Sequence, residues 1–188
     1  MAPEFPLSSL EIANARLWRS EIAGFQNQSV PREATLFLGS SSIALWSTLA
    51  QHFPDFPVIN RGFGGSQLSD SVYYFQSLFL PAAPSAVVFY AGDNDLAFGK
   101  KSSRLAQNFH LLADLMQTHL PQTPLFFISI KPSPARWNLI GEIRASNSLI
   151  EMICRQREQL HFVNADFVML DENKKPRPEL YIEDGLHL

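Results

Sequence analysis

The segment Ser85-Ala86-Val87-Val88-Phe89-Tyr90 decides the fold class of this 188-residue chain. It is a continuous apolar run of strand length, and strands that are apolar on both faces are typical of parallel sheets buried between helix layers. Four further short apolar runs indicate the other strands, at 35–38, 58–60, 124–130 and 160–163. The sequence therefore predicts a central, mostly five-stranded parallel sheet.

Segments with helical periodicity lie between these strands, which places the chain in the α/β class. They cover residues 8–26, 42–50, 68–80, 102–119 and 138–158, and from 166 onward the chain is expected to form loops. In the opening helix 8–26, Leu10 and Leu17 are expected to face the core and Glu11 to face solvent. The alternation of strand and helix predicts a doubly wound, three-layer α/β/α fold.

The composition fits one domain over residues 1–188, because 46% apolar and 18% charged residues can form a sizeable core. The net charge of −3 and the scattered Lys and Arg residues argue against a nucleic-acid partner. No apolar run is long enough to span a membrane, and residues 1–6 lack the features of a secretory signal. Because Cys154 is the single cysteine and lies at helical spacing from Ile150, we expect a buried structural thiol and a cytoplasmic location.

Four short polar motifs stand out from this framework. Three follow predicted strands directly: Gly39-Ser40-Ser41-Ser42, the glycine-rich turn at 60–66, and Gly92-Asp93-Asn94-Asp95. The fourth, Asp184-Gly185-Leu186-His187, lies at the end of the sequence. Since ligands of open α/β sheets bind at the carboxyl ends of the strands, we expect the first three motifs to meet at one edge.

Together the motifs contain the groups that acyl transfer needs. A serine hydroxyl attacks a carbonyl only when a base takes its proton, and Asp184 with His187 can supply that base. Ser41 is the candidate nucleophile, because its amide at a strand-to-helix junction can face an anion. Asn94 is a neutral donor for an oxyanion, and the glycine turn 62–65 can aim an amide at the same oxyanion.

Taken singly, each motif also has a structural explanation. The serines could cap a helix, Asn94 could brace a turn, and Asp184 with His187 could be a polar tail. Asp93 and Asp95 would suit a metal ion, but no cluster of His or Cys accompanies them, so we expect them to brace the loop. It is the joint occurrence of all four motifs that favours a hydrolase.

In this combination the sequence resembles the SGNH hydrolases, also called the GDSL esterase and lipase family, from Phe37 to His187. The family's Gly-Asp-Ser is matched by Gly39-Ser40-Ser41 and its glycine donor by Gly65. Its Gly-x-Asn-Asp block is matched by residues 92–95, and its Asp-x-x-His block by residues 184–187.

The resemblance implies a flavodoxin-like fold and carboxylic-ester hydrolysis without a metal or another cofactor. Ser41 would be the nucleophile, His187 the base, and Asp184 the group that orients the imidazole. The amides of Ser41 and Gly65 and the side chain of Asn94 would hold the oxyanion. The implied substrate is a small ester, and acetyl groups on carbohydrate are the leading candidate.

Two features depart from the family pattern. Ser40 replaces the Asp of the first block, which is not the triad acid, so the local bracing must differ. Family members usually continue past the His with a helix that covers part of the sheet, whereas here Leu188 follows His187 directly. We therefore expect association of chains into a homo-oligomer, or reduced stability.

Two other functions remain open on the sequence. A non-catalytic carbohydrate-binding or scaffolding module could keep the SGNH fold without turnover. A flavodoxin-like cofactor binder would use the same loops for phosphate, and would not need Asp184 or His187. Three residues are candidates for lining the substrate pocket: Phe63, Arg136 and Trp137.

Overall fold

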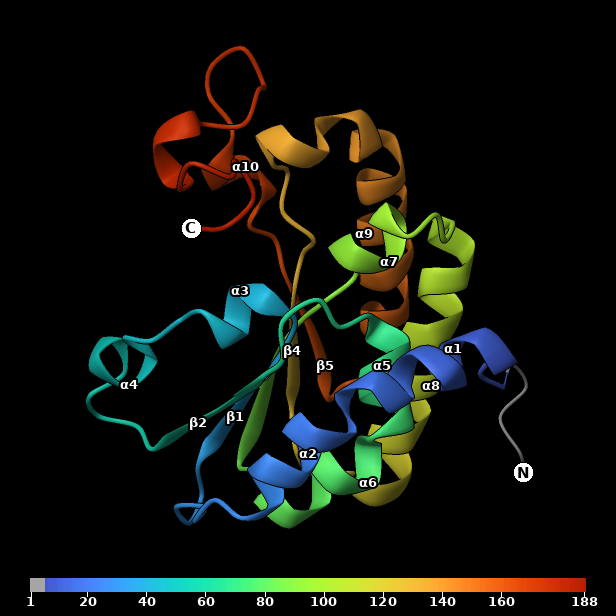
Figure 1. Ribbon diagram of the computed structural model, residues 1–188, viewed down its shortest axis with the longest axis vertical. Helices are drawn as coiled ribbons and strands as arrows, with labels where there is room; N and C mark the ends of the chain where they lie inside the picture. Colours follow the sequence, from blue (N-terminus) through green and yellow to red (C-terminus); the bar gives the residue numbers. More distant parts are fainter. Residues whose placement is uncertain (1–5) are drawn as a thin grey trace.

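A five-stranded parallel sheet forms the centre of the computed structural model, which describes residues 6–188 (Figure 1). Residues 1–5, which carry most of the segment assessed for a secretory signal, lie outside the described residues. The strand order is β2-β1-β3-β4-β5, the flavodoxin-like order. The strands are β1 Thr35–Gly39, β2 Val58–Gly62, β3 Ala86–Tyr90, β4 Leu125–Ile128 and β5 Leu160–Val163. The predicted fold class is confirmed.

The strand order reverses beside β1, and ligands of open α/β sheets bind at the carboxyl ends of the strands at such a reversal. Gly39 pairs with Gly62 on one side and with Tyr90 on the other. Its φ is +147°, and a Cβ at this position would lie 1.8 Å from the carbonyl oxygen of Tyr90. Only glycine fits here, because the backbones of β1 and β3 approach too closely for a side chain.

The larger helix layer covers one face of the sheet (Figure 1). Alternate strand residues point into this layer, among them Leu36, Leu38, Val87, Phe89 and Phe127. The main helices of the layer are α1 Ser9–Ala15, α2 Arg19–Gln26, α5 Leu68–Tyr73, α6 Phe75–Leu78, α8 Ser102–His119 and α9 Ile140–Arg155. The period of two along each strand thus supplies the main core.

The second face carries a thinner layer made by two short helices, α3 Ser41–Ala44 and α4 Leu49–His52 (Figure 1). Phe37, Ile43, Leu49 and Tyr90 form a separate core cluster there, with Trp46 packed against it. The helical side of this cluster, Ile43, Trp46 and Leu49, therefore comes from the segment that directly follows the serine motif.

The remaining elements lie near the carboxyl edge or connect the layers. α7 Asp93–Ala97 follows β3, and the segment from α10 Asp166–Met169 to Leu188 lies above the same edge, in red in Figure 1. Four 3-10 helices complete the described part of the chain: η1 Arg16–Trp18, η2 Leu80–Ala82, η3 Pro134–Leu139 and η4 Pro178–Leu180. Within residues 6–188, no helix combines the length and apolarity needed to cross a membrane.

The prediction of one opening helix with Leu10 and Leu17 inward is wrong. The helix is interrupted at η1, and these two side chains are 79% and 72% exposed, whereas Glu11 is 3% exposed. Burial alone would raise the pKa of Glu11, but hydrogen bonds from Arg104 and Asn108 outweigh this and hold the pKa below its usual range. A buried charge network therefore overrides the apolar pattern on this helix.

Other helix boundaries also differ from the sequence prediction. The predicted helix 42–50 is two short helices separated by a turn, the helix 68–80 divides at Tyr74, and the last predicted helix ends at Arg155. The short helices α7, α10 and η4 occupy segments that were expected to be loops. Cys154 is buried as predicted, and burial raises the pKa of its thiol to about 12.

Candidate active site

Ser41 begins α3 immediately after β1 ends. Ser40 is the N-cap residue, fully buried, and its amide donates to the carbonyl of Tyr90 at 2.9 Å. Asn60 braces the turn, because its Nδ2 donates to the carbonyl of Ile43 at 2.7 Å and its Oδ1 accepts from the amide of Gly62 at 2.9 Å. This leaves the half-buried Ser41 at the open edge between β1 and β3.

Asp184 and His187 form a compact turn at the other end of the chain. Asp184 Oδ1 accepts from the amides of Leu186 and His187 at 2.8 and 2.9 Å, and Asp184 Oδ2 lies 2.5 Å from His187 Nδ1. Hydrogen bonds from the His187 amide and imidazole, followed by the Leu186 amide, lower the pKa of Asp184 to about 2. The carboxylate is therefore ionised across the neutral range.

The structure brings this turn onto the serine motif. His187 Nε2 lies 2.8 Å from Ser41 Oγ. Because a carboxylate only accepts, the Asp184 contact places a proton on His187 Nδ1, and in the neutral ring this leaves Nε2 as an acceptor. Chemically, this arrangement can take a proton from the Ser41 hydroxyl.

The glycine turn lies beside Ser41. A Cβ at Gly64 would lie 4.0 Å from Ser41 Cβ, and Gly65 has a φ of +82°. The amide of Phe63 donates to the carbonyl of Gly39 at 2.9 Å, which ties this turn to the end of β1. Among residues 6–188, the amides of Ser41 and Gly65 have no hydrogen-bond acceptor, so both remain able to bind a ligand oxygen.

Asn94 is held at both ends of its side-chain amide. Nδ2 donates to the carbonyl of Ser66 at 2.9 Å, and Oδ1 accepts from Arg136 Nη2 at 2.8 Å. One N–H of the amide remains for a further acceptor, since the Nδ2 group carries two hydrogens.

A family model described as GDSL-like Lipase/Acylhydrolase matches residues 33–188. The chain belongs to this family. As a GDSL-like hydrolase it is a carboxylic-ester hydrolase, and esters are its substrates. No curated protein matches it in sequence.

Solved structures share the fold of this GDSL-like hydrolase. A protein from Streptococcus pneumonia, provisionally named a platelet activating factor, superposes with a TM-score of 0.80 at 17% identity, over 97% of this chain and 92% of its own. A GDSL-like lipase from Bacteroides thetaiotaomicron gives 0.71 at 22% identity, over 93% and 89%. A carbohydrate esterase family 3 protein from Talaromyces cellulolyticus gives 0.60 at 17% identity, over 82% and 87%.

The two aspartates beside Asn94 brace the loop after β3, as the sequence predicted. Asp95 is fully buried and accepts from the amide of Leu68 at 2.8 Å and from Lys100 Nζ at 2.9 Å. Asp93 lies 3.1 Å from Arg136 Nη1. Within residues 6–188, no three His, Cys, Asp or Glu side chains are grouped so that they could hold a metal ion.

Lys131 lies beside the candidate site and was not predicted from the sequence. It is 4% exposed, and its Nζ donates to Ser42 Oγ at 2.9 Å and to Tyr90 Oη at 3.0 Å. Burial lowers the pKa of Lys131, while the charge of Asp93 opposes the shift. Lys131 could have been recognised in the sequence by its position directly after the apolar run 124–130, which places it at the carboxyl edge of the sheet.

A pocket of about 390 Å³ lies beside His187 in the GDSL-like hydrolase. Its other lining residues come mostly from the α3–α4 segment: Ser42, Leu45, Trp46, Ser47, Thr48, His52 and Leu188. The three predicted lining residues do not contribute. Phe63 is buried against Trp18, Arg136 binds Asn94, and the Trp137 ring faces Lys175 Nζ at 4.7 Å.

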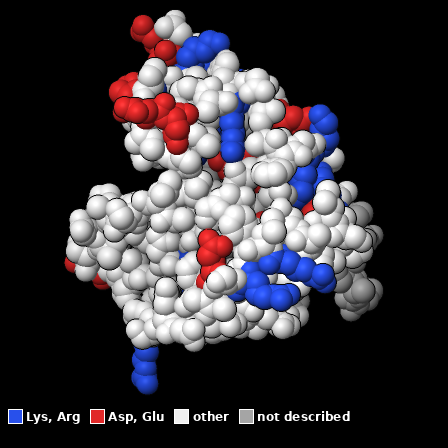
Figure 2. All heavy atoms as spheres, in the orientation of Figure 1, with Lys and Arg blue, Asp and Glu red and all other residues white. Residues whose placement is uncertain are grey.

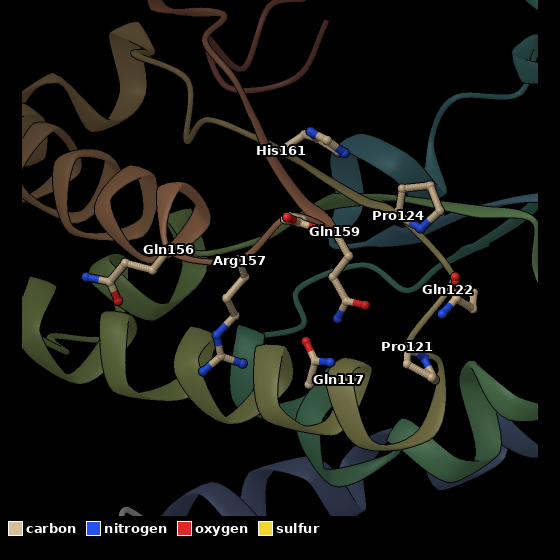
Figure 3. A pocket seen from close by; sticks show the side chains of 9 residues that line it. Gln117, Pro121, Gln122, Pro124, Gln156, Arg157, Gln159 and His161 are labelled. Atoms are coloured by element: carbon tan, nitrogen blue, oxygen red, sulfur yellow. The ribbon is translucent and has the colours of Figure 1, made fainter.

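A larger hollow of about 690 Å³ lies far from this chemistry, by the amino ends of β4 and β5 (Figure 3). It is lined by glutamine and proline residues, with Arg157, Glu158 and His161. Arg157 is paired with Asp114, and His161 stacks on Phe126. This hollow contains no nucleophile and none of the candidate site residues.

Proposed function

We propose that this protein hydrolyses esters of small acyl groups, acetyl in particular, through Ser41, His187 and Asp184. The observation that carries the proposal is the continuous hydrogen-bonded chain from Ser41 Oγ to His187 Nε2, at 2.8 Å, and from His187 Nδ1 to Asp184 Oδ2, at 2.5 Å. A nucleophile, a base and an orienting acid in this geometry form the minimal unit of serine hydrolysis.

In the acylation step, Ser41 Oγ attacks the ester carbonyl carbon while its proton passes to His187 Nε2. The ionised Asp184 stabilises the imidazolium that results. As the tetrahedral intermediate collapses, the bond to the alcohol oxygen breaks, and His187 Nε2 returns the proton to that oxygen. The alcohol leaves, and the acyl group stays on Ser41.

Three donors stabilise the negative oxygen of the intermediate: the amides of Ser41 and Gly65 and the second N–H of Asn94. The free N–H groups at these positions support this assignment. Water then enters, His187 takes its proton, and the hydroxide attacks the acyl carbon. As the second intermediate collapses, the acyl bond to Ser41 Oγ breaks and His187 Nε2 returns the proton to that oxygen, which releases the acid and restores the Ser41 hydroxyl.

The alcohol part of the ester occupies the pocket beside His187, because this residue must reach the leaving oxygen. Residues 35–54, which supply most of the lining, contain no Asp, Glu, Lys or Arg. Figure 2 shows a largely uncharged surface over this side of the molecule. A neutral lining suits a neutral alcohol, since a charged one would lose hydration without gaining an ion pair.

A carbohydrate alcohol fits the mixture of groups in this pocket. The Trp46 ring is held by edge contacts to Phe37 and Phe53, at centroid distances of 5.8 and 5.9 Å, and offers an apolar surface. Trp46 Nε1 donates to His52 Nδ1 at 2.8 Å, which leaves His52 Nε2 as a donor for a sugar hydroxyl. The fold shared with the Talaromyces carbohydrate esterase agrees with acetylated carbohydrate as substrate.

Covalent labelling tests the proposed nucleophile. Wild-type protein treated with a fluorophosphonate should gain one adduct on the peptide that carries Ser41, and fragmentation should locate it on that residue. Ser41→Ala should gain none, His187→Ala should react much more slowly, and Ser20→Ala, a serine control on the surface of α2, should react like wild type. An adduct on Ser40 or Ser42 would contradict the proposal.

A further inference from the structure

Residues 131–136 follow β4 and include the first turn of η3, and they contact three of the four segments of the candidate active site. Lys131 Nζ donates to Ser42, next to the candidate nucleophile. The amide of Ala135 donates to the carbonyl of Gly185 at 3.1 Å, inside the turn that carries His187. Arg136 Nη2 donates to Asn94 Oδ1 at 2.8 Å. Although none of the four family motifs includes this segment, it binds the nucleophile turn, the acid–base turn and the oxyanion donor.

In the hydrogen bond between Arg136 and Asn94, Arg136 can only be the donor and Asn94 must be the acceptor. An arginine side chain can only donate hydrogen bonds, and a backbone carbonyl can only accept them. Arg136 must therefore face Oδ1 of Asn94, and the carbonyl of Ser66 must face Nδ2. The two opposite partners allow one orientation of the amide and exclude the flipped one.

This orientation matters because the flipped amide would present an oxygen to the oxyanion. With Oδ1 and one hydrogen of Nδ2 occupied, the position of the second hydrogen is set by the planar amide. A positive charge on the carbonyl end also polarises the amide, which makes the N–H at its other end a stronger donor.

Arg136 is itself held in place. Its backbone leaves the helical conformation within η3, at φ −120° and ψ 23°, and its side chain is 17% exposed. Nη1 lies 3.1 Å from Asp93 Oδ2, in an ion-pair contact without hydrogen-bond geometry. Asp93 Oδ1 accepts from the amide of Asn94 at 3.0 Å, so the carboxylate links the guanidinium to the backbone of the residue that it orients.

We propose that Arg136 is a positioning residue of the oxyanion hole, which fixes the Asn94 side-chain amide in its donating orientation and strengthens its free N–H. The inference rests on the proposed function, because it requires Asn94 to bind the oxyanion. Arg136 would therefore stabilise the transition state without affecting substrate binding.

A double-mutant cycle on p-nitrophenyl acetate hydrolysis tests this role. Arg136→Met removes the charge and the donors but keeps much of the side-chain volume. We expect it to lower kcat about 10- to 100-fold, less than the roughly 10²–10³-fold expected for loss of a whole oxyanion donor in Asn94→Ala, with KM changed less than about threefold. In the Asn94→Ala background, Arg136→Met should cause no further loss, because its effect passes through that side chain.

Arg136→Lys is the conservative variant and covers the case in which the methionine variant does not fold. It keeps the charge but not the fork that reaches both Asp93 and Asn94, so it should recover only part of the lost kcat. Melting curves identify variants that are folded. Losses that add in the double mutant, or a folded Arg136 variant with wild-type kcat, would overturn the inference alone. A folded Asn94→Ala with wild-type kcat would instead overturn the proposed oxyanion hole.

Discussion

His187 Nε2 lies 2.8 Å from Ser41 Oγ, although 146 positions separate the two residues along the chain. The contact exists because β1 delivers Ser41 to the carboxyl edge of the sheet and the last turn of the described chain lies over the same edge. Asp184 Oδ2 contacts the imidazole on its other side, and Oδ1 accepts from the backbone amide of His187. This contact underlies the proposed chemistry.

Asp184→Asn should reduce kcat by about 10²–10⁴-fold while leaving the fold intact. An asparagine amide that donates to His187 Nδ1 forces the proton of the neutral ring onto Nε2, which then cannot accept from Ser41. Stopped-flow assays of p-nitrophenyl acetate hydrolysis would measure the loss. A variant with wild-type kcat would mean that Asp184 does not set the protonation of the imidazole.

Gly39→Ala should destabilise the protein by more than about 3 kcal/mol, because the new Cβ collides with the carbonyl of Tyr90 at a positive φ. Urea denaturation gives the free energy of unfolding. Gly24→Ala is the matched control, since position 24 in α2 has open space around it and alanine there should stabilise by about 0.5–1 kcal/mol. Equal changes in the free energy of unfolding at positions 39 and 24 would contradict the proposed close approach of β1 and β3 at Gly39.

The raised pKa of the Asp95 carboxyl group predicts a specific pH dependence of the free energy of unfolding. Burial raises its pKa to about 6, so the folded state holds the proton more tightly than the unfolded state does. Stability is therefore greatest below the ordinary carboxyl pKa and falls as pH rises from about 4 to about 7, through the folded pKa, by about 3 kcal/mol for this group. Urea denaturation across this range should show the decline in wild type and a flatter profile in Asp95→Asn. Stability that rises equally in both proteins would contradict the assignment.

Trp46 should determine the preference for the alcohol part of the ester. Trp46→Leu is expected to raise KM about tenfold for an acetylated monosaccharide, equivalent to roughly 1.4 kcal/mol, with a much smaller change for ethyl acetate. Phe56→Leu, at an exposed aromatic residue outside the pocket, is the control and should resemble wild type. Equal changes in KM for the two esters would mean that Trp46 does not recognise the alcohol part of the substrate.

The sheet was predictable because its signals are local. The apolar run at 86–89 and its four counterparts fix the strands, and the glycine at 39 marks where β1 meets β3. The edge at which the motifs meet follows from the parallel order of the strands. Ser41 and Asn94 could be named for the same reason, whereas Asp184 and His187 follow no strand and could be named only from their Asp-x-x-His spacing.

The features that sequence reasoning missed depend on partners far along the chain. Glu11 is buried because Arg104 and Asn108 reach it from α8, which no helical period reveals. Lys131 stood outside the recognised motifs, and Arg136 was predicted only to line the substrate pocket. Their contacts with Ser42 and Asn94 arise only when β4 lies next to β3. The walls of the pocket beside His187 were not predicted, because they come from the turn between two short helices that the sequence pattern joined into one.

The central claim is that Ser41 and His187 act as one unit, and a comparison of single and double alanine variants tests it most directly. Steady-state hydrolysis of p-nitrophenyl acetate should fall by more than about 10³-fold in Ser41→Ala and in His187→Ala, and the double variant should be no slower than the slower single one. A folded Ser41→Ala protein that retains wild-type turnover, or losses that multiply in the double variant, would contradict the account.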